Sequence, residues 1–227
     1  MKRILTLAAA AAALACGSTS SNNAATSRNN PGAGSSTLLV QGDITASTIT
    51  GSPVTTFSVT VRDGALATVG GATVTVRNSS VPDGVVNLVQ AVPGTGAYAA
   101  TLTSIPSGDF QLNVVKGSDS VQGVQVGGPG MHTINAPVQN ATVTANQDLP
   151  VSWTTPAVAK QVSVVTRDMS FSAPDLGAYT ILAADNPPRA SQRVTITRTN
   201  EVEAAGGLTG SRLNVSYSAR IDPYTVQ

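Results

Sequence analysis

Residues 57–64 read FSVTVRDG, an alternation of apolar and polar side chains that ends in an Asp-Gly turn. Phe57, Val59 and Val61 would lie on one face of a strand and the polar residues between them on the other. This is the pattern of an antiparallel strand that is buried on one side. The same alternation recurs at residues 72–77, 98–102 and 110–114. No segment past Leu14 shows the 3.6-residue period of an amphipathic helix, so we predict an all-β chain.

The composition supports a folded protein and argues against nucleic-acid binding. The chain has 227 residues, of which 41% are hydrophobic, 11% charged and 4% aromatic, with a net charge of +1. The apolar fraction is ordinary for a globular protein. Charge that is this sparse and balanced provides no basic surface for a phosphate backbone, and so few aromatics provide no stacking platform. We therefore expect no nucleic-acid partner.

The N-terminus has the features of an export signal. Lys2 and Arg3 precede an uninterrupted apolar run at residues 4–14. Eleven helical residues rise about 16 Å, which is too short for a hydrocarbon core of about 30 Å. We therefore interpret residues 1–15 as a signal peptide and not as a membrane-spanning helix.

The segment Ala13-Leu14-Ala15-Cys16 resembles a bacterial lipobox. The resemblance implies that Cys16 becomes the mature N-terminus and carries a diacylglycerol thioether and an N-acyl chain. Cys16 is the single cysteine, so the exported chain has no disulfide framework and its lone thiol has an evident use. Two or three acyl chains anchor stably. The alternative is an ordinary secretory signal beside an incidental cysteine.

The residue after the cysteine bears on the location. Gly17 stands where Asp is the inner-membrane retention signal of lipoproteins in enteric-type bacteria. The resemblance therefore implies a cell-envelope protein of the outer membrane, with the periplasmic or surface side left open. Residues 16–36 are rich in Ser, Asn and Gly without hydrophobic periodicity, so we predict that they form a disordered tether.

The remaining chain divides into two parts at a Gly/Pro-rich stretch that starts with GGPG at residues 127–130. We place a first β-sandwich at residues 37–135 and a second at residues 136–227. Each part has about 90–100 residues, which is enough for a sandwich without disulfides.

Two family resemblances fit this division. The first part resembles the transthyretin-like (carboxypeptidase regulatory-like) sandwich through VTVRDG at 59–64, GATVTV at 71–76, GTGAYAATL at 94–102 and GDFQLNVVKG at 108–117. In the second part, LPVSWTTP at 149–156 is similar to the strand of fibronectin type III and other immunoglobulin-like domains that carries a core tryptophan. DLGAY at 175–179 resembles an immunoglobulin tyrosine corner. Together they imply two tandem immunoglobulin-like/transthyretin-like sandwiches, with Trp153 in a core.

Catalytic and metal-binding motifs are missing from the sequence. His132 is the only histidine, and its position beside the Gly/Pro-rich stretch predicts a solvated connector residue. No zinc, nucleotide or nucleophile motif accompanies it. Calcium would have Asp63, Asp83 and Asp109 as its best ligands if their loops converged, but Asp beside Gly or Ser more commonly caps a turn. We expect no enzyme activity and no cofactor.

Arginines in the last third of the chain give the one positive signal of a site. Alternation along residues 212–221 puts Arg212 and Arg220 on a polar face, and Arg193 and Arg198 lie upstream. These four arginines form the candidate partner-binding face, and an acidic glycan or a protein loop is the candidate ligand. The alternative is a sheet face that arginine merely keeps soluble.

The function class follows from the anchor and the folds. A membrane-anchored lipoprotein made of sandwiches exposes loops and strand edges to partners without needing catalytic residues. We therefore predict a non-catalytic binding or assembly module of the cell envelope, whose partners are the membrane, through its lipid, and an envelope protein or glycan. The alternatives are a structural spacer without a specific ligand and, more distantly, an enzyme accessory domain.

Overall fold

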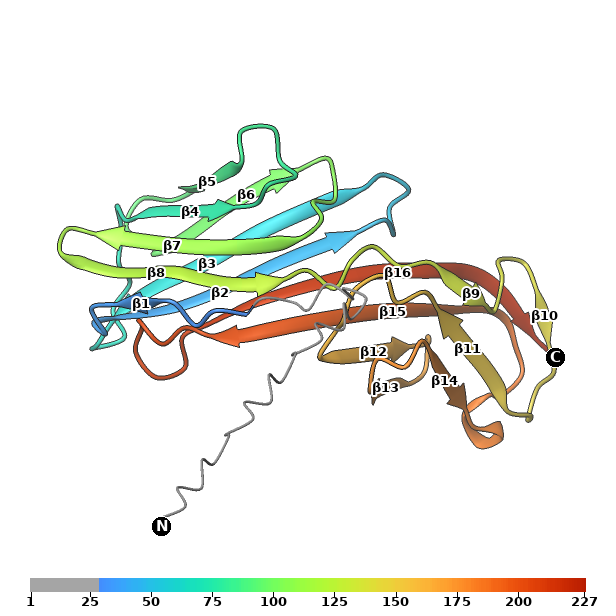
Figure 1. The fold of residues 1–227 in the computed structure, drawn as a ribbon. Helices are drawn as coiled ribbons and strands as arrows, with labels where there is room; N and C mark the ends of the chain where they lie inside the picture. Colours follow the sequence, from blue (N-terminus) through green and yellow to red (C-terminus); the bar gives the residue numbers. More distant parts are fainter. Residues whose placement is uncertain (1–28) are drawn as a thin grey trace, which may run out of the picture.

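The computed structural model describes residues 29–227, so the predicted signal peptide, Cys16 and the predicted tether up to residue 28 lie outside the described residues. The described chain is almost entirely β-structure, as predicted, and forms two sandwiches side by side (Figure 1). Its one helical element is a short 3₁₀ turn at Ala183–Asp185. Within residues 29–227 no helix has the length and apolar character needed to cross a membrane.

The strands of the first part are β1 (Ala33–Gly34), β2 (Leu38–Ser47), β3 (Val54–Asp63), β4 (Thr73–Arg77), β5 (Val85–Gln90), β6 (Ala97–Leu102), β7 (Asp109–Lys116) and β8 (Asp119–Gly127). Those of the second are β9 (Ile134–Ala136), β10 (Thr142–Val143), β11 (Leu149–Trp153), β12 (Gln161–Val165), β13 (Ser170–Ala173), β14 (Ala178–Ile181), β15 (Arg189–Glu203) and β16 (Arg212–Val226).

The first sandwich packs the layer β1-β8-β7-β4-β5 against the layer β6-β3-β2-β16. A short pairing of β5 with β6 joins the two layers at one edge. Phe57, Val59 and Val61 of β3 point into the core and meet Leu112 and Val114 of β7, and all five are buried. Each such side chain contributes about 1.5–3 kcal/mol by leaving water, so the alternation read from the sequence is what holds the layers together.

The second sandwich packs the small sheet β14-β11-β9 against β10, β16, β15, β12 and β13. Trp153, at the end of β11, is 3% exposed and belongs to this core, as predicted. The expected tyrosine corner is not formed. The Tyr179 ring packs on Phe171 with their centroids 5.2 Å apart, so it closes an edge between the two sheets and does not pin a loop.

The hairpin of β15 and β16 runs through both sandwiches, whereas we predicted a division between residues 135 and 136. Each of its strands has 15 residues. Leu213, Val215 and Tyr217 lie in the first core, whereas Tyr224 and Val226 lie in the second. β16 also pairs in parallel with β2, from Arg212 opposite Gln41 to Ser218 opposite Ser47. Alternation shows which face of a strand is buried and not which core receives it, so sequence alone assigned the whole hairpin to the second unit.

The N-terminal segment of the described chain is also ordered, although we predicted a tether up to residue 36. The backbone of Asn30 exchanges hydrogen bonds with Gln125 at 2.9 and 2.8 Å, and β1 pairs with β8. The Ser36 amide donates to the Gly206 carbonyl at 3.0 Å. Gly34 permits this approach, because a Cβ there would lie 2.4 Å from the Gly206 oxygen. Backbone pairing, which composition does not report, orders the segment.

Candidate functional site

Arg198, one of the four arginines of the candidate face, is fully buried with 0% of its side chain exposed. Its Nε lies 3.2 and 3.1 Å from the two carboxylate oxygens of Asp175, and its terminal nitrogens donate to the carbonyls of Pro129, Gly130 and Ala157. The residue is therefore unavailable to a partner. It has the same parity on β15 as buried Val194 and Ile196, so the alternation already placed it inward.

The buried ion pair belongs to a cluster that fixes the connecting segment between the two sandwiches, residues 128–133, which joins β8 to β9. The Asp175 side chain is 5% exposed and also accepts a hydrogen bond from Trp153 Nε1 at 2.9 Å. Burial raises the pKa of Asp175, but the hydrogen bonds from Arg198 and Trp153 and the Arg198 charge outweigh it, so the pKa lies below its ordinary value. Asn200 adds bonds to the Gly127 and Val158 carbonyls, both at 2.8 Å. Arg198 and Asn200, both on β15, thus hold the chain at residues 127–130.

His132 lies beside this cluster and is not the solvated connector residue that we predicted. It is 2% exposed, and its Nε2 lies 3.1 Å from the Ile196 carbonyl oxygen. Burial and the Arg198 charge lower its pKa to about 4, against smaller opposing effects of the Ile196 bond and Asp175. The ring is therefore neutral at pH 7, and its Nδ1 is buried without a partner among the described residues. The Gly and Pro residues beside His132 suggested that it is exposed, but its side chain is buried against β15 of the second sandwich.

Two other arginines of the candidate face, Arg193 and Arg220, lie together on the outer side of the second sandwich. Arg220 is opposite Thr195 on β15, and its Nε donates to the Thr195 hydroxyl at 3.3 Å. Arg193 is two residues from Thr195 on the same face, at the register irregularity between Gln192 and Val194. Both side chains are partly exposed.

Arg167 extends this cationic group. The backbone amides of Arg167 and Arg193 both donate to Gln192 Oε1 at 2.9 Å, so the two residues are neighbours. Arg167 pairs with Asp222 at 3.0 Å, whereas Arg193 and Arg220 form no ion pair among residues 29–227. We call Arg167, Arg193, Arg220 and Asp222 the arginine surface; three arginines and one aspartate give it a charge of +2.

Arg212, the fourth arginine of the candidate face, is exposed but lies elsewhere. It is at the start of β16, opposite Glu203 and Gln41. Arg220 is eight residues further along the same strand, about 27 Å away at about 3.4 Å per residue. The predicted face is thus divided into two surface arginines that are neighbours, one that is remote and one that is buried.

The aspartates considered as calcium ligands do not converge. Asp63 Oδ1 accepts the amides of Ala65 and Ala67 at 2.9 and 3.0 Å, which is the turn-capping role expected of Asp before Gly. Asp109 Oδ2 accepts Gln125 Nε2 at 2.8 Å. In the part of the chain that the structure describes, no three His, Cys, Asp or Glu side chains gather as metal ligands.

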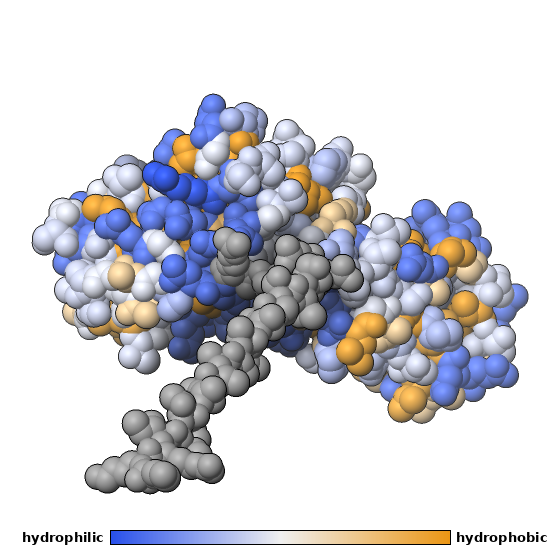
Figure 2. Space-filling model, viewed as in Figure 1, coloured by the Kyte–Doolittle hydropathy of each residue, from blue (hydrophilic) through white to orange (hydrophobic). Residues whose placement is uncertain are grey.

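Sequence reasoning missed two hollows, of which the first joins loops that are separated in the chain and the second is lined by residues within 136–150. One of about 540 Å³ lies on the outer face of the layer that holds β4, β7 and β8, and its lining is polar. The other, of about 270 Å³, lies between β9, β10 and β11 and has a more apolar lining. Figure 2 shows that polar and weakly apolar residues mix over the visible face, with apolar residues in small scattered groups.

The comparisons with known proteins give likenesses among solved structures only. No family model matches the sequence, and no curated protein matches it. The adhesin InvE of Yersinia pseudotuberculosis is 16% identical with a TM-score of 0.26, over 81% of this chain and 60% of that one. Fibronectin(III)-like modules of CbhA from Clostridium thermocellum are 14% identical with a TM-score of 0.28, over 83% and 91%.

A third structure, the BSP domain of a biofilm-associated protein, is 16% identical with a TM-score of 0.25. The match covers 82% of this chain and 30% of that one. The chain thus spans only part of the adhesin and of the biofilm protein. TM-scores this low leave the function to be inferred from the chain's own residues.

Proposed function

We propose that this chain is a non-catalytic binding module of the cell envelope whose arginine surface holds a carboxylate-bearing partner. The observation that carries the proposal is the pair Arg193 and Arg220, which are neighbours on an exposed sheet face and have no carboxylate partner in the described chain. A guanidinium presents donors in a planar fork that matches a carboxylate. The ligand is an acidic glycan or an acidic loop of an envelope protein.

The experiment is loss of binding in a double variant, with removal of a remote exposed arginine as the control. Arg193→Ser with Arg220→Ser removes the two guanidinium groups that lack a carboxylate partner, whereas Arg212→Ser removes an exposed charge about 27 Å from Arg220 on the same strand. Retention of the protein on immobilised polygalacturonate should fall in the double variant and stay close to wild type in Arg212→Ser. It should also weaken with salt, because exposed charges are screened.

Cross-linking in cells distinguishes the two sources of the carboxylate. A photo-reactive residue in place of Thr195, between the two arginines, should trap one dominant protein if the ligand is a protein loop. Polygalacturonate retention without a trapped protein assigns the ligand to the glycan. If the double variant keeps both polygalacturonate retention and the cross-link, the arginine surface is not the partner site.

We also propose that the module is anchored to the outer membrane by lipid on Cys16, which rests on the lipobox resemblance. Labelled palmitate should be incorporated into the wild-type protein and not into a Cys16→Ser variant. The variant should leave the membrane fraction during envelope fractionation. An unlabelled wild-type protein, or a variant that fractionates unchanged, refutes the anchor without bearing on the arginine surface.

The first sandwich supports a finer assignment as a transthyretin-like domain. The four motifs that carry this resemblance fall in chain order on β3, β4, β6 and β7. An experimental structure that gives these strands a different order would refute it.

A spacer is the second candidate, and the continuous hairpin favours it. β15 and β16 pair along their length through both sandwiches, and Arg198 and Asn200 hold the connecting segment. The two sandwiches therefore keep one relative orientation, as a stalk requires. Cross-links from many surface positions to scattered neighbours, with no loss in the arginine double variant, would favour the spacer.

A further inference from the structure

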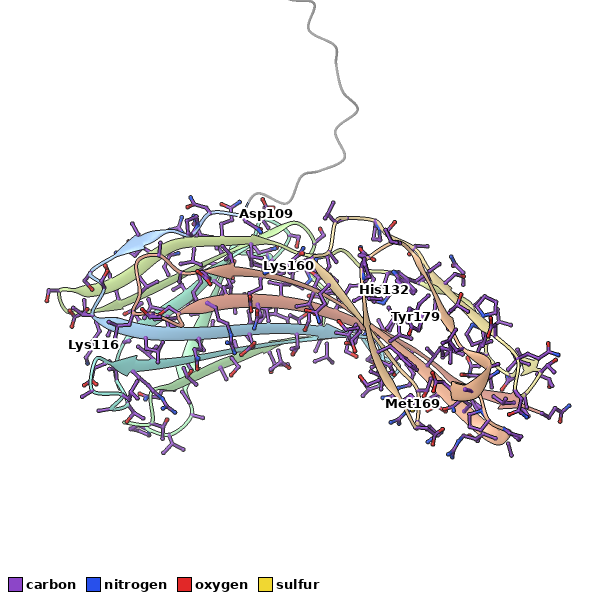
Figure 3. The ribbon with its side chains drawn as sticks, turned by 90° about the horizontal axis from the view of Figure 1, so that it is seen from below. Asp109, Lys116, His132, Lys160, Met169 and Tyr179 are labelled. Atoms are coloured by element: carbon purple, nitrogen blue, oxygen red, sulfur yellow. The ribbon has the colours of Figure 1, made fainter. Side chains whose placement is uncertain are left out.

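The hollow on the outer face of the first sandwich is built from three strands and two loops. Arg77 at the end of β4, Gln111 on β7 and Gln125 on β8 stand side by side, because Arg77 is opposite Gln111 and Gln111 is opposite Gln125. Asp109 lies two residues before Gln111 on the same face. Figure 3 shows Asp109 near the middle of the molecule, where the first sandwich adjoins the second. The hollow is a depression largely open to solvent, and its volume of about 540 Å³ is within the range of about 300–1,000 Å³ for small-molecule sites.

The rim of the hollow is held by a buried asparagine. Asn78 donates through Nδ2 to the carbonyls of Ser107 and Asp109 at 2.9 and 3.0 Å. Its Oδ1 accepts the amide and the hydroxyl of Ser80. The loop after β4 and the loop before β7 are thereby tied to each other. The hollow is consequently formed before any ligand arrives, which reduces the ordering cost of binding.

Several polar groups around the cavity are free to bind. Within residues 29–227, the side chains of Arg77, Ser79 and Gln111 make no hydrogen bond or ion pair with the protein. Asp109 uses Oδ2 for Gln125, and its Oδ1 remains open. The site thus offers a guanidinium and an amide as donors, and a carboxylate and an amide oxygen as acceptors, on a few neighbouring positions.

Two glycines leave space over the rim. A Cβ on Gly84 or on Gly108 would meet nothing within 4 Å, and both residues have positive φ, at +66° and +78°. Glycine adopts this conformation without strain, whereas other residues rarely do. Both loops therefore turn without placing a side chain in the cavity.

We propose that this hollow binds a neutral saccharide. Vicinal hydroxyl groups accept from a guanidinium and donate to a carboxylate at the same time, as the mixed lining of Arg77 and Asp109 requires. A purely anionic ligand would face the Asp109 carboxylate, and a purely cationic ligand would face Arg77. The named lining has no large apolar side chain for a lipid chain or an aromatic ligand. The site is separate from the arginine surface, which lies on β15, β16 and the loop between β12 and β13.

The test follows the side-chain amide signals of Gln111 and Gln125 by NMR on the full-length protein in detergent. Chitotriose and mannotriose are the neutral probes, trigalacturonate is the acidic probe and a lysine dipeptide is the cationic probe, each at up to about 10 mM. At least one neutral trisaccharide should shift these signals in a saturable way, while the acidic and cationic probes should not. Absence of a shift with both neutral sugars, or a shift with only a charged probe, overturns the proposal.

Variants then test whether the amide signal shifts arise from sugar bound in the hollow. Gln111→Ala and Asp109→Asn should each weaken binding of the active sugar about tenfold or more, since each removes a hydrogen-bonding group from the site. Thr75→Ala is the matched control, because Thr75 lies on the same face of β4 outside the hollow. Unchanged amide signals from the cores show that each variant is folded. Equal binding by all three variants overturns the proposal, and Arg193→Ser with Arg220→Ser should leave sugar binding intact.

Discussion

Replacing Arg198 with methionine removes the guanidinium that neutralises a buried carboxylate and keeps much of the side-chain volume. In the variant, Asp175 stays 95% buried beside Trp153 without its cation, because its side chain is 5% exposed in the wild type. The carbonyls of Pro129, Gly130 and Ala157 lose their donor as well. The change therefore tests whether this cluster holds the two sandwiches together.

The expected cost is about 4 kcal/mol of unfolding free energy at pH 7, since removing one partner of a buried ion pair costs about 3–5 kcal/mol. That is a large part of a total stability of about 5–15 kcal/mol. Adding Asp175→Asn should restore part of the loss, because no charge is then buried and the amide oxygen can still accept from Trp153. Arg212→Met, the exposed control, should cost less than about 0.5 kcal/mol.

Urea unfolding followed by tryptophan fluorescence is a direct assay, because Trp153 is the only tryptophan and lies in the cluster. The pH dependence gives a second check. Without Arg198, burial raises the pKa of Asp175 above its ordinary 3.8, so the deficit of the variant should shrink as the pH falls from 7 and the carboxyl becomes protonated. Equal midpoints for Arg198→Met and Arg212→Met, or a deficit that does not change with pH, would refute the reasoning.

Three further predictions concern His132 in the connecting segment, the boundary between the two sandwiches, and the N-terminal segment that pairs with β8. The pKa of His132 is about 4 in the folded protein, against an ordinary value of 6.5. The free energy of unfolding should therefore decrease as the pH is lowered from 6.5 to 4, by at most about 3 kcal/mol. His132→Gln should remove this slope in pH-dependent melts; an unchanged slope contradicts it. A fragment of residues 29–135 lacks β16 and should be unfolded by circular dichroism, whereas a native spectrum would restore the predicted boundary. Gly34→Ala should cost about 1–3 kcal/mol, because its Cβ would lie 2.1 Å from the Ser120 oxygen. Gly64→Ala, with open space, is the control in thermal melts, and equal melting temperatures would contradict the prediction.

The sequence was sufficient for the strands and their buried faces, because period-two alternation reports burial directly. Phe57, Val59 and Val61 are buried, and so are Leu213 and Val215, as the alternation predicts. The same rule, applied to β15, would have placed Arg198 beside Val194 and Ile196 in the interior. We grouped it with surface arginines by residue type, and type is a weaker signal than parity when a buried carboxylate is present in a distant loop.

The partners of each element were beyond the sequence, because they depend on contacts between residues remote in the chain. The Val40 amide donates to Ser211 Oγ, and Asn214 Nδ2 donates to Asp43, in each case across 171 positions. The polar hollow likewise needs β4, β7 and β8 to be neighbours before its residues form a site. The composition of loops and strands predicts neither these hydrogen bonds nor the hollow. The arginine surface was partly predictable, since Arg193 and Arg220 have the parity of outward residues.

The continuous hairpin has a consequence for how a binding module of this kind transmits load. β16 supplies Tyr217 to the first core, where its hydroxyl donates to the Pro106 carbonyl, and Tyr224 to the second core. β16 contributes side chains to both cores, so its detachment from one sandwich would disturb its packing in the other. We therefore expect the two sandwiches to unfold together. Under the proposed function, a partner held at the arginine surface would pull on β15 and β16, and β16 would pass the force to β2 through seven register pairs of a parallel ladder. Backbone hydrogen bonds that cross from strand to strand share a load applied along the strands, which suits a protein whose N-terminal segment is itself paired to β8.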